Sequence, residues 1–478
     1  MAAQNCSASN TYQVSGGSKL SASSYLHAIW PFCMKTQCIC NPAPGKYTME
    51  NILMGMHTNR RLAPILLGFV CIGFLLACET SPPYNAIPSP VTQESGDADF
   101  AELLNSIRLE ERLPGLAAAI IIDSKLHSAA AVGFRESGTD NWLTVNDKFM
   151  IGSCAKAFTA TTAAILVEEG RLSWQTTIRD AFPDLNILPQ YENITIQQLL
   201  SHRAGLPKNL KEGTTWLTDY GFDKKRGSAP EILRLQYLEQ TVQNKLISPP
   251  GKVIHYSNSG YILAGAILEK IAGRTYEELL EEKIITPLGL ATAGYGPPAA
   301  LEPTSQPWGH YWDKSTKSFV AYQADYPKFL SPAGGIHMSI KDWVKFIIVH
   351  LNSDPSDKTK LLKSSSLQFL HTPPDSAEWD FSFKERMSSK FFGYGYLNSN
   401  YALGWFTKEK DKGYDLIYHG GRGFAFNAMV LADLKTKNAI LLVTNTEVSH
   451  VHPTIQNLLM IKKIKEHYSK QVKLPFTN

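Results

Sequence analysis

Cysteine is nearly absent from most of the chain, which limits how it can be cross-linked or bind metal. Six of the seven cysteines lie within the first 78 residues, and only Cys154 lies beyond them. A lone cysteine cannot form an intrachain disulfide in that part of the chain. The early cluster "CMKTQCIC" (33–40) lacks further cysteine or histidine residues at the spacing that a tetrahedral zinc site requires. We therefore expect no metal site.

The chain also lacks an excess of one charge outside its first segment. Its formal net charge is +4, but residues 78–478 carry 42 acidic and 42 basic side chains. A neutral surface does not attract a phosphate backbone, so nucleic acid is excluded as the main partner. No self-similarity at a period of about 20–50 residues is visible, which excludes solenoids and propellers.

The longest apolar run is too short to cross a membrane. It covers 16 residues, 62–77, whereas a membrane-spanning helix needs about 20. Arg60 and Arg61 precede the run and "LLAC" ends it at Cys78, which resembles a bacterial lipobox. This pattern predicts a lipid on Cys78. It would anchor the protein to a membrane of a bacterial cell envelope, facing the periplasm or the exterior. A plain signal peptide and an uncleaved anchor are the alternatives.

These signals divide the chain into five predicted parts. Residues 1–55 precede a credible signal sequence, and we interpret them as a non-structural extension caused by a start codon assigned too far upstream. Residues 56–77 are the predicted lipoprotein signal peptide. Residues 78–99 are rich in proline and serine and predict an extended tether. Residues 100–450 form the predicted folded body, and 451–478 a C-terminal helix and tail.

The body shows strand patterns at both ends and helix patterns between them. Two strands are expected over 114–134 around a turn at 123–125, and later strands over 401–408, 426–436 and 438–446. Helices are expected over 98–112, 154–170, 258–273 and 455–468, with one more inside 331–351. The fold class is therefore α/β in the broad sense (α+β). One antiparallel sheet is built from both ends of the body and flanked by helices, with a mainly helical second subdomain.

The stretch "MIGSCAKAFTA" (150–160) offers two nucleophiles and a lysine. Ser153 alone is read equally well as the N-cap of the following helix. Lys156 lies three residues further on, so a helix places both side chains on one face. A hydroxyl beside an amine of lowered proton affinity is a nucleophile with a base. Cys154 is rotated by about 100° from that face and is expected to pack in the core.

Two later motifs carry polar groups of the right kind. In "HYSNSGY" (255–261), Tyr256 and Asn258 fall on one side of an extended backbone, although a half-buried tyrosine and a helix cap explain them equally well. In "YHGGRGF" (418–424), glycines around His419 and Arg422 allow a close approach by a ligand. A loose hairpin turn is the alternative there.

The three motifs together resemble those of the penicillin-recognising serine hydrolases, in the class C β-lactamase branch with its related esterases and D-amino-acid peptidases. That family carries Ser-x-x-Lys, Tyr-x-Asn and Lys/His/Trp-x-Gly in this order. The similarity spans about 100–447. It includes the segments 113–120, 199–207, 249–273, 287–296, 331–339 and 441–446.

The resemblance implies a β-lactamase/transpeptidase-like fold and acyl transfer through a covalent intermediate. Ser153 would be the nucleophile, and Lys156 and Tyr256 would share the acid and base roles, in an order that the residues leave open. Asn258, His419, Gly421 and Arg422 would bind substrate. The backbone N–H groups of Ser153 and Arg422 would form the oxyanion hole. No cofactor is implied, and the oligomeric state is left open.

The third motif departs from the family's usual Lys-Thr-Gly. His419 supplies less positive charge at neutral pH than lysine, and Gly420 has no hydroxyl. We therefore expect a serine hydrolase whose substrate is a small molecule or a peptide. The bonds that it hydrolyses would be esters or the amides of D-amino-acid peptides, and its β-lactamase activity would be weak or absent. The alternative is a penicillin-binding or sensor protein that is acylated without efficient turnover. A purely structural lipoprotein is a second alternative.

Overall fold

The structure is a computed structural model. It describes residues 87–211, 229–302, 305–322, 327–352, 361–374, 378–379, 400–410, 413–446 and 453–468. The chain divides into two compact units, Met1–Glu79 and Thr80–Asn478, and every described residue belongs to the second. The predicted extension, the signal peptide and Cys78 therefore lie outside the described residues. In the described ranges no helix is both long and apolar enough to span a membrane.

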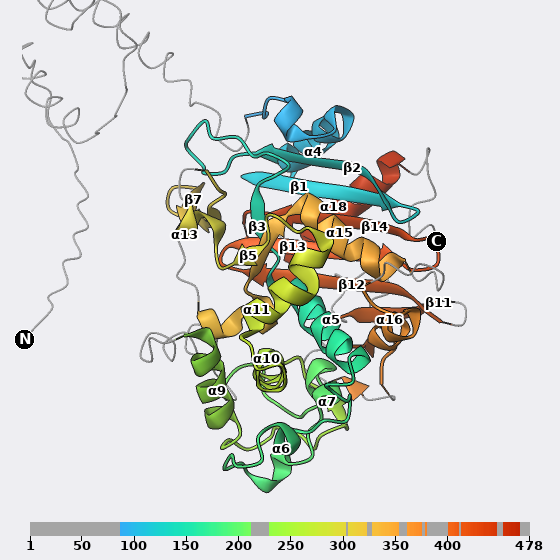
Figure 1. The fold of residues 1–478 in the computed structure, drawn as a ribbon. Helices are drawn as coiled ribbons and strands as arrows, with labels where there is room; N and C mark the ends of the chain where they lie inside the picture. Colours follow the sequence, from blue (N-terminus) through green and yellow to red (C-terminus); the bar gives the residue numbers. More distant parts are fainter. Residues whose placement is uncertain are drawn as a thin grey trace, which may run out of the picture. The chain divides into compact units, whose positions relative to one another are not determined.

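The second unit is organised around a seven-stranded antiparallel sheet with the order β10–β11–β12–β13–β14–β1–β2 (Figure 1). β1 pairs with β14, with Ile120 opposite Ile440, so the two ends of the body meet in one sheet as predicted. The strands are β1 (Gly115–Ile122), β2 (Lys125–Gly133), β10 (Asn400–Tyr401), β11 (Phe406–Lys410), β12 (Gly413–Gly423), β13 (Phe426–Asp433) and β14 (Asn438–Thr444).

The β1–β2 hairpin follows from its sequence. Small and β-branched residues fill β1, and the turn is made by Asp123 and Ser124, whose φ angles are +48° and +57°. A two-residue turn with positive φ at both positions matches the twist of the strands that it joins. Side chains along β1 alternate between the two faces of the sheet, so each face receives its own half of the core.

Helices cover both faces of the sheet. α4 (Ala98–Glu110) and α18 (Pro453–Tyr468) pack on the face that receives Leu116, Ala118 and Ile120. The other face, with Ala117 and Ala119, packs against α5 and α15. Residues 451–478 were predicted to lie beyond the body, but α18 packs on the same sheet because Met460, Ile461 and Ile464 are buried there.

A helical part extends from the second face, with α6, α7 and α9 around α10 in Figure 1. The longer helices here and on the sheet are α5 (Ala155–Glu168), α9 (Pro230–Thr241), α10 (Asn258–Ala272), α15 (Ile340–Leu351) and α16 (Ser364–His371). The shorter ones are α6 (Ile178–Ala181), α7 (Ile196–Leu200), α11 (Tyr276–Leu280), α12 (Thr286–Leu288), α13 (Pro298–Leu301) and α14 (Ser331–Gly334). A π-helical turn, Glu281–Ile285, joins α11 to α12.

Short strands and 3-10 turns complete the described elements. The strands are β3 (Lys148–Met150), β4 (Val253–Ile254), β5 (Gly294–Tyr295), β6 (Gly309–Asp313), β7 (Ser318–Tyr322), β8 (Ile336–Ser339) and β9 (Glu378–Trp379). The turns are η3 (Gln93–Ser95), η4 (Gly152–Cys154), η5 (Pro189–Tyr191) and η7 (Lys328–Leu330).

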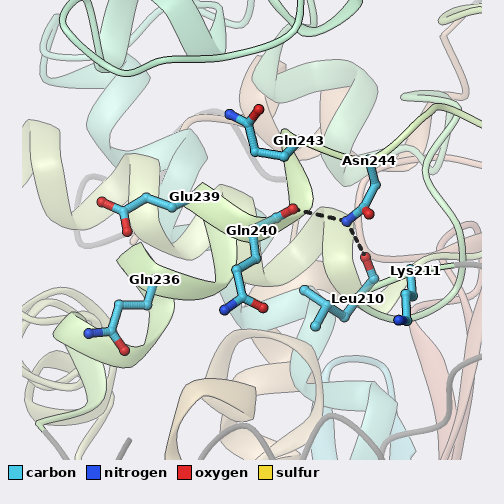
Figure 2. Close-up of a pocket in the computed structure, with 7 residues that line it drawn as sticks. All are labelled: Leu210, Lys211, Gln236, Glu239, Gln240, Gln243 and Asn244. Atoms are coloured by element: carbon cyan, nitrogen blue, oxygen red, sulfur yellow. Dashed lines mark hydrogen bonds between the residues drawn. The ribbon is translucent and has the colours of Figure 1, made fainter.

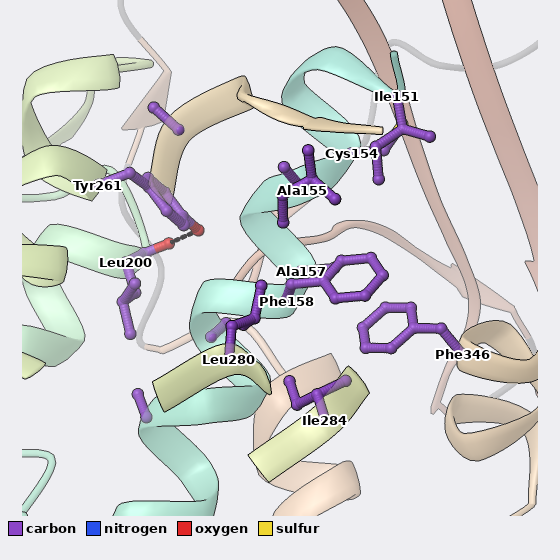
Figure 3. Close-up of a cluster of buried hydrophobic side chains, with 14 of the residues drawn as sticks. Ile151, Cys154, Ala155, Ala157, Phe158, Leu200, Tyr261, Leu280, Ile284 and Phe346 are labelled. Atoms are coloured by element: carbon purple, nitrogen blue, oxygen red, sulfur yellow. Dashed lines mark hydrogen bonds between the residues drawn. The ribbon is translucent and has the colours of Figure 1, made fainter. Parts of the chain in front are cut away.

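α5 is the central helix of the core and carries the first motif. Figure 3 shows Phe158 of α5 stacked on Phe346 of α15, with ring centroids 3.6 Å apart. In the same cluster the Tyr261 hydroxyl of α10 donates to the carbonyl of Leu200, 2.5 Å away. α5 is therefore held between the sheet and the helical part.

Two predicted elements differ from the structure. The tether predicted over 78–99 ends earlier, because Ser89 and Ser95 are buried and the Ser89 hydroxyl accepts the N–H of Gly133. The Ser89 hydroxyl thus binds the sheet, and the Ser95 hydroxyl bonds the Pro90 carbonyl within the same segment. The single strand predicted over 401–408 is two strands, β10 and β11, because Gly404 turns the chain with a φ of +82° where it presses on α5.

A buried ion network joins the helices of the second part. Arg234 of α9 is fully buried, and its guanidinium lies 2.6 Å from both Glu269 of α10 and Glu277 of α11. Glu277 also accepts a hydrogen bond of 2.6 Å from Ser331, the first residue of α14. The network therefore fixes α14 against three other helices.

Replacing Arg234 by alanine is expected to destabilise the protein, because it leaves two acidic side chains without their buried partner. We expect the free energy of unfolding to fall by about 3–5 kcal/mol. Arg274→Ala is the matched control: its pair with Glu282 is largely exposed, and such pairs contribute about 1 kcal/mol or less. Urea unfolding of both variants checks this, and equal losses would contradict a special role for Arg234.

Candidate active site

The turn that carries Ser153 is in direct backbone contact with β12. Ser153 lies in η4, between two buried neighbours, and α5 begins at Ala155, one residue later than predicted. A Cβ on Gly152 would lie 2.5 Å from the backbone nitrogen of Arg422, and one on Gly421 would lie 1.9 Å from the carbonyl oxygen of Ile151. Glycine is required at both positions. The Arg422 N–H therefore lies beside the Ser153 turn.

Lys156 projects from the first turn of α5 into a fully buried position. Its Nζ lies 3.2 Å from Ser153 Oγ, 3.0 Å from Asn258 Oδ1 and 2.6 Å from the carbonyl oxygen of Ala333 in α14. A carbonyl oxygen can only accept a hydrogen bond. The neutral amine has two N–H groups for those two carbonyl oxygens and one lone pair left for the Ser153 hydroxyl.

The environment favours that neutral amine. Burial, and then the positive charge of Lys208, hold the pKa of the Lys156 ammonium well below its usual value. Lys208 is exposed on the loop after α7, and its carbonyl accepts the N–H of Asn258. The lowered pKa favours the neutral amine, which is the form that can accept a proton.

Tyr256 completes the group around Ser153. Lys156 Nζ lies 4.9 Å from the centroid of its half-buried ring. Burial raises the pKa of the Tyr256 phenol above its usual value, and a hydrogen bond with Ser153 offsets part of the rise. The rise favours the protonated phenol, which is the form that can donate a proton.

Asn258 is the first residue of α10, and the Ser257 hydroxyl caps that helix. Its Nδ2 donates to Asn209 Oδ1 over 3.1 Å, which leaves Oδ1 for Lys156. Asn209 is buried and so determines which way the Asn258 amide faces.

The third motif lies on β12, with its strand backbone along the Ser153 turn. The register with β11 ends at the pair Phe406 and Tyr418, so in the described ranges the backbone from His419 onward pairs only with β13. The Arg422 side chain is exposed and Gly421 is buried. Among the described residues, the edge of β12 that faces away from β13 is therefore unpaired from His419 onward.

His419, which was predicted to bind substrate, is buried beneath the site. Its ring is 1% exposed, and its Nε2 lies 3.1 Å from the Tyr401 hydroxyl. Burial lowers the pKa of His419 to about 3, so the ring is neutral. The His419 side chain therefore has almost no exposed surface in this structure, and its ring lies against Tyr401.

Cys154 is turned into the core, as expected. It is 2% exposed, has a free thiol, and its Sγ lies 3.4 Å from the His419 carbonyl oxygen. Burial raises the pKa of the thiol, which opposes formation of a thiolate. Of the two adjacent candidates, Ser153 is the one that reaches Lys156.

Several residues of the site were not singled out from the sequence. They lie in or directly after segments that carried the family resemblance, "LLSHRAGLP" (199–207) and "SPAGGIHMS" (331–339), or beside β11. Spacing alone gave no reason to assign them roles, because their contacts join distant parts of the chain. They are Ala333, whose carbonyl binds Lys156, together with His202, Lys208, Asn209 and Tyr401.

The described residues contain no group of three or more His, Cys, Asp or Glu side chains that could hold a metal. A separate cavity of about 400 Å³ lies beside α9, and neither Ser153, Lys156 nor Tyr256 lines it. Figure 2 shows Asn244 in that cavity donating to the carbonyls of Leu210 and Gln240. It is lined by Leu210, Lys211, Gln236, Glu239, Gln240, Gln243 and Asn244.

Comparison with known proteins relates the whole arrangement to one family. The protein-family model described as Beta-lactamase matches residues 97–462. The chain is 29% identical over 277 residues to Penicillin-binding protein 4 of Amycolatopsis lactamdurans, across 57% of this chain and 69% of that protein. It is 25% identical over 342 residues to Unguisins hydrolase ungD' of Aspergillus campestris, across 69% of this chain and 58% of that protein. The chain thus spans less than two thirds of the second relative.

Solved structures share the fold at low sequence identity. The octameric penicillin-binding protein homologue from Pyrococcus abyssi has a TM-score of 0.61 and 22% identity, covering 78% of this chain and 82% of that one. The Beta-Lactamase/D-Alanine Carboxypeptidase from Pseudomonas syringae has a TM-score of 0.58 and 16% identity, covering 77% of this chain and 97% of that one. The predicted β-lactamase/transpeptidase-like fold is confirmed.

The reactivity of Ser153 is expected to follow the protonation of Lys156. Labelling by a fluorophosphonate probe should slow as the pH falls through the lowered pKa of Lys156, because the protonated amine cannot accept the hydroxyl proton. Lys156→Met should slow labelling by about 10²-fold or more. Lys208→Met should raise the pKa of Lys156, since it removes a nearby positive charge. The acidic limb of the plot of labelling rate against pH should then move to higher pH. An unchanged limb would contradict the electrostatic role of Lys208.

Proposed function

The chain belongs to the β-lactamase-related family of penicillin-recognising serine hydrolases, and we propose that it acts through an acyl-enzyme formed on Ser153. In the proposed reaction Ser153 Oγ attacks the carbonyl carbon of the substrate while its proton moves to Lys156 Nζ. The new oxyanion would accept hydrogen bonds from the backbone N–H groups of Ser153 and Arg422. The leaving group departs with a proton, and water then hydrolyses the acyl-enzyme.

The observation that carries this proposal is the set of contacts around Lys156. Two of its neighbours, Asn258 Oδ1 and the Ala333 carbonyl, can only accept hydrogen bonds, and the third is Ser153 Oγ. Together with the lowered pKa, these contacts support Lys156 as the first proton acceptor. Tyr256, whose pKa is raised, is then the proposed donor to the leaving group.

The proposed substrates are esters or amides of D-amino-acid peptides, within the class C-related branch. A neutral, buried His419 offers no positive charge to a substrate carboxylate, and Gly420 offers no hydroxyl. Arg422 is the exposed cation next to the open edge of β12 and is the proposed contact for a substrate anion. One similar protein is named a hydrolase of unguisins, and another is named a Beta-Lactamase/D-Alanine Carboxypeptidase; a carboxypeptidase hydrolyses a peptide amide.

A substrate panel on the full chain tests the proposal. Small esters and D-amino-acid amides should be hydrolysed, and nitrocefin should turn over far more slowly than a dedicated β-lactamase would achieve. Ser153→Ala should lower turnover by about 10⁴-fold or more. Cys154→Ala is the matched control and should keep most of the activity. Full activity in Ser153→Ala would contradict the proposed mechanism.

The alternative function is a penicillin-binding or sensor protein that is acylated but turns over poorly, and one relative is named a penicillin-binding protein. The same variants separate the two. Stoichiometric trapping of a fluorescent penicillin at Ser153, without hydrolysis of any ester or amide in the panel, would favour the alternative.

We also propose that the protein is lipid-anchored through Cys78 in a bacterial cell envelope. The support is the sequence alone: two arginines, a 16-residue apolar run and a cysteine directly after it. The proline- and serine-rich residues that follow would give the catalytic unit reach from the membrane surface.

Lipidation is tested by expressing the full chain in bacteria with labelled palmitate. Wild-type protein should carry the label and sediment with membranes, whereas Cys78→Ser should lose the label. Cys71→Ser, which changes a cysteine inside the apolar run, is the control and should stay labelled. Label that persists in Cys78→Ser would contradict attachment at this residue.

A further inference from the structure

His202 has an unusual backbone for its residue type. It follows α7 and Ser201, and its φ is +61°, in the left-handed region where helices commonly end with glycine or asparagine. A histidine side chain at such a position is unfavourable relative to glycine. The ring is also 1% exposed, and its Nε2 has no hydrogen-bond partner in the described part of the chain. The left-handed backbone and the buried Nε2 without a described partner each oppose folding, and both occur at His202.

His202 makes two hydrogen bonds to the second motif, one on each side of Tyr256. The His202 carbonyl accepts the N–H of His255 over 2.9 Å, and Nδ1 accepts the N–H of Ser257 over 3.1 Å. These are the residues directly before and after Tyr256. The main chain and the side chain of His202 thus hold the Tyr256 backbone on both sides.

The His202 ring also contacts the Tyr256 ring directly. The two centroids are 4.3 Å apart, and the centroid of Tyr401 lies 4.3 Å away from the same imidazole. The Tyr401 hydroxyl is in turn 3.1 Å from His419 Nε2. Because Nδ1 accepts a hydrogen bond, the neutral imidazole carries its hydrogen on Nε2. His202 therefore connects the second motif to the third.

We propose that His202 is a positioning residue for Tyr256 in the acyl-transfer reaction. The inference rests on the proposed function, since it concerns the placement of the phenol next to Ser153. Bonds on both sides of Tyr256 and a ring against its face leave the phenol little freedom to move away from the nucleophile. A strained residue held at an active site is expected where it improves the geometry of the reaction.

Three substitutions separate the hydrogen bond from the ring contact. His202→Asn keeps an acceptor at the position of Nδ1 and tolerates the left-handed backbone, but it loses the ring. His202→Gln moves the acceptor one carbon too far. His202→Gly relieves the backbone and removes both contacts. His255→Gln is the matched control, because the N–H that binds His202 stays in place.

Hydrolysis of a small p-nitrophenyl ester by the full chain is the readout. We expect kcat to fall about 10-fold in His202→Asn and about 100-fold in His202→Gln and His202→Gly, with KM changed less than about threefold. His202→Gly should melt no lower than His202→Gln, so that lost folding does not explain its lost activity. His255→Gln should keep the wild-type kcat.

The outcomes distinguish this inference from the proposed function. A Ser153-dependent activity whose kcat is unchanged in His202→Gln and His202→Gly overturns the positioning role alone. Equal losses in His202→Asn and His202→Gln also overturn the assigned hydrogen bond. Ester hydrolysis that survives Ser153→Ala, or no hydrolysis by the wild-type chain, overturns the proposed function and this inference with it.

Discussion

The contact between two backbones, one around Gly152 and one around Gly421, is the constraint on which the site depends. It brings a turn from the first third of the chain against a strand from the last quarter, with no side chain between them. The two backbones lie so close that a Cβ on Gly152 or Gly421 would clash with the facing chain. The position of the Arg422 N–H relative to the Ser153 turn is therefore nearly fixed. A nucleophile and an oxyanion donor gain from such rigidity, since preorganised dipoles need no rearrangement during the reaction.

The buried amine of Lys156 depends on a second set of constraints from the helical part. One of its acceptors, the Ala333 carbonyl, belongs to α14, and the network of Arg234, Glu269 and Glu277 holds that turn through Ser331. Ions far from the nucleophile therefore help to place one of the two carbonyl groups that contact Lys156. The helices joined by the buried ion network also include α14, which supplies a contact to Lys156.

Local patterns predicted much of this architecture, and contacts between distant residues account for what they missed. The glycine after α10 and the turn at Asp123 are local signals, and the corresponding helix and hairpin have the expected extents. The end of the tether and the break at Gly404 were missed, because each depends on packing against β2 or α5. The face shared by Ser153 and Lys156 was predictable from helix geometry. The burial of His419 was not, because it depends on Tyr401.

The pairing of β1 with β14 determines when the site can form during folding. Strands from both ends must be made before the sheet can close, and Cys154 contacts a residue 265 positions away in the sequence. Contacts of such long range are slow to form, because a large loop must be ordered first. A growing chain therefore has no assembled nucleophile until its last strands have emerged.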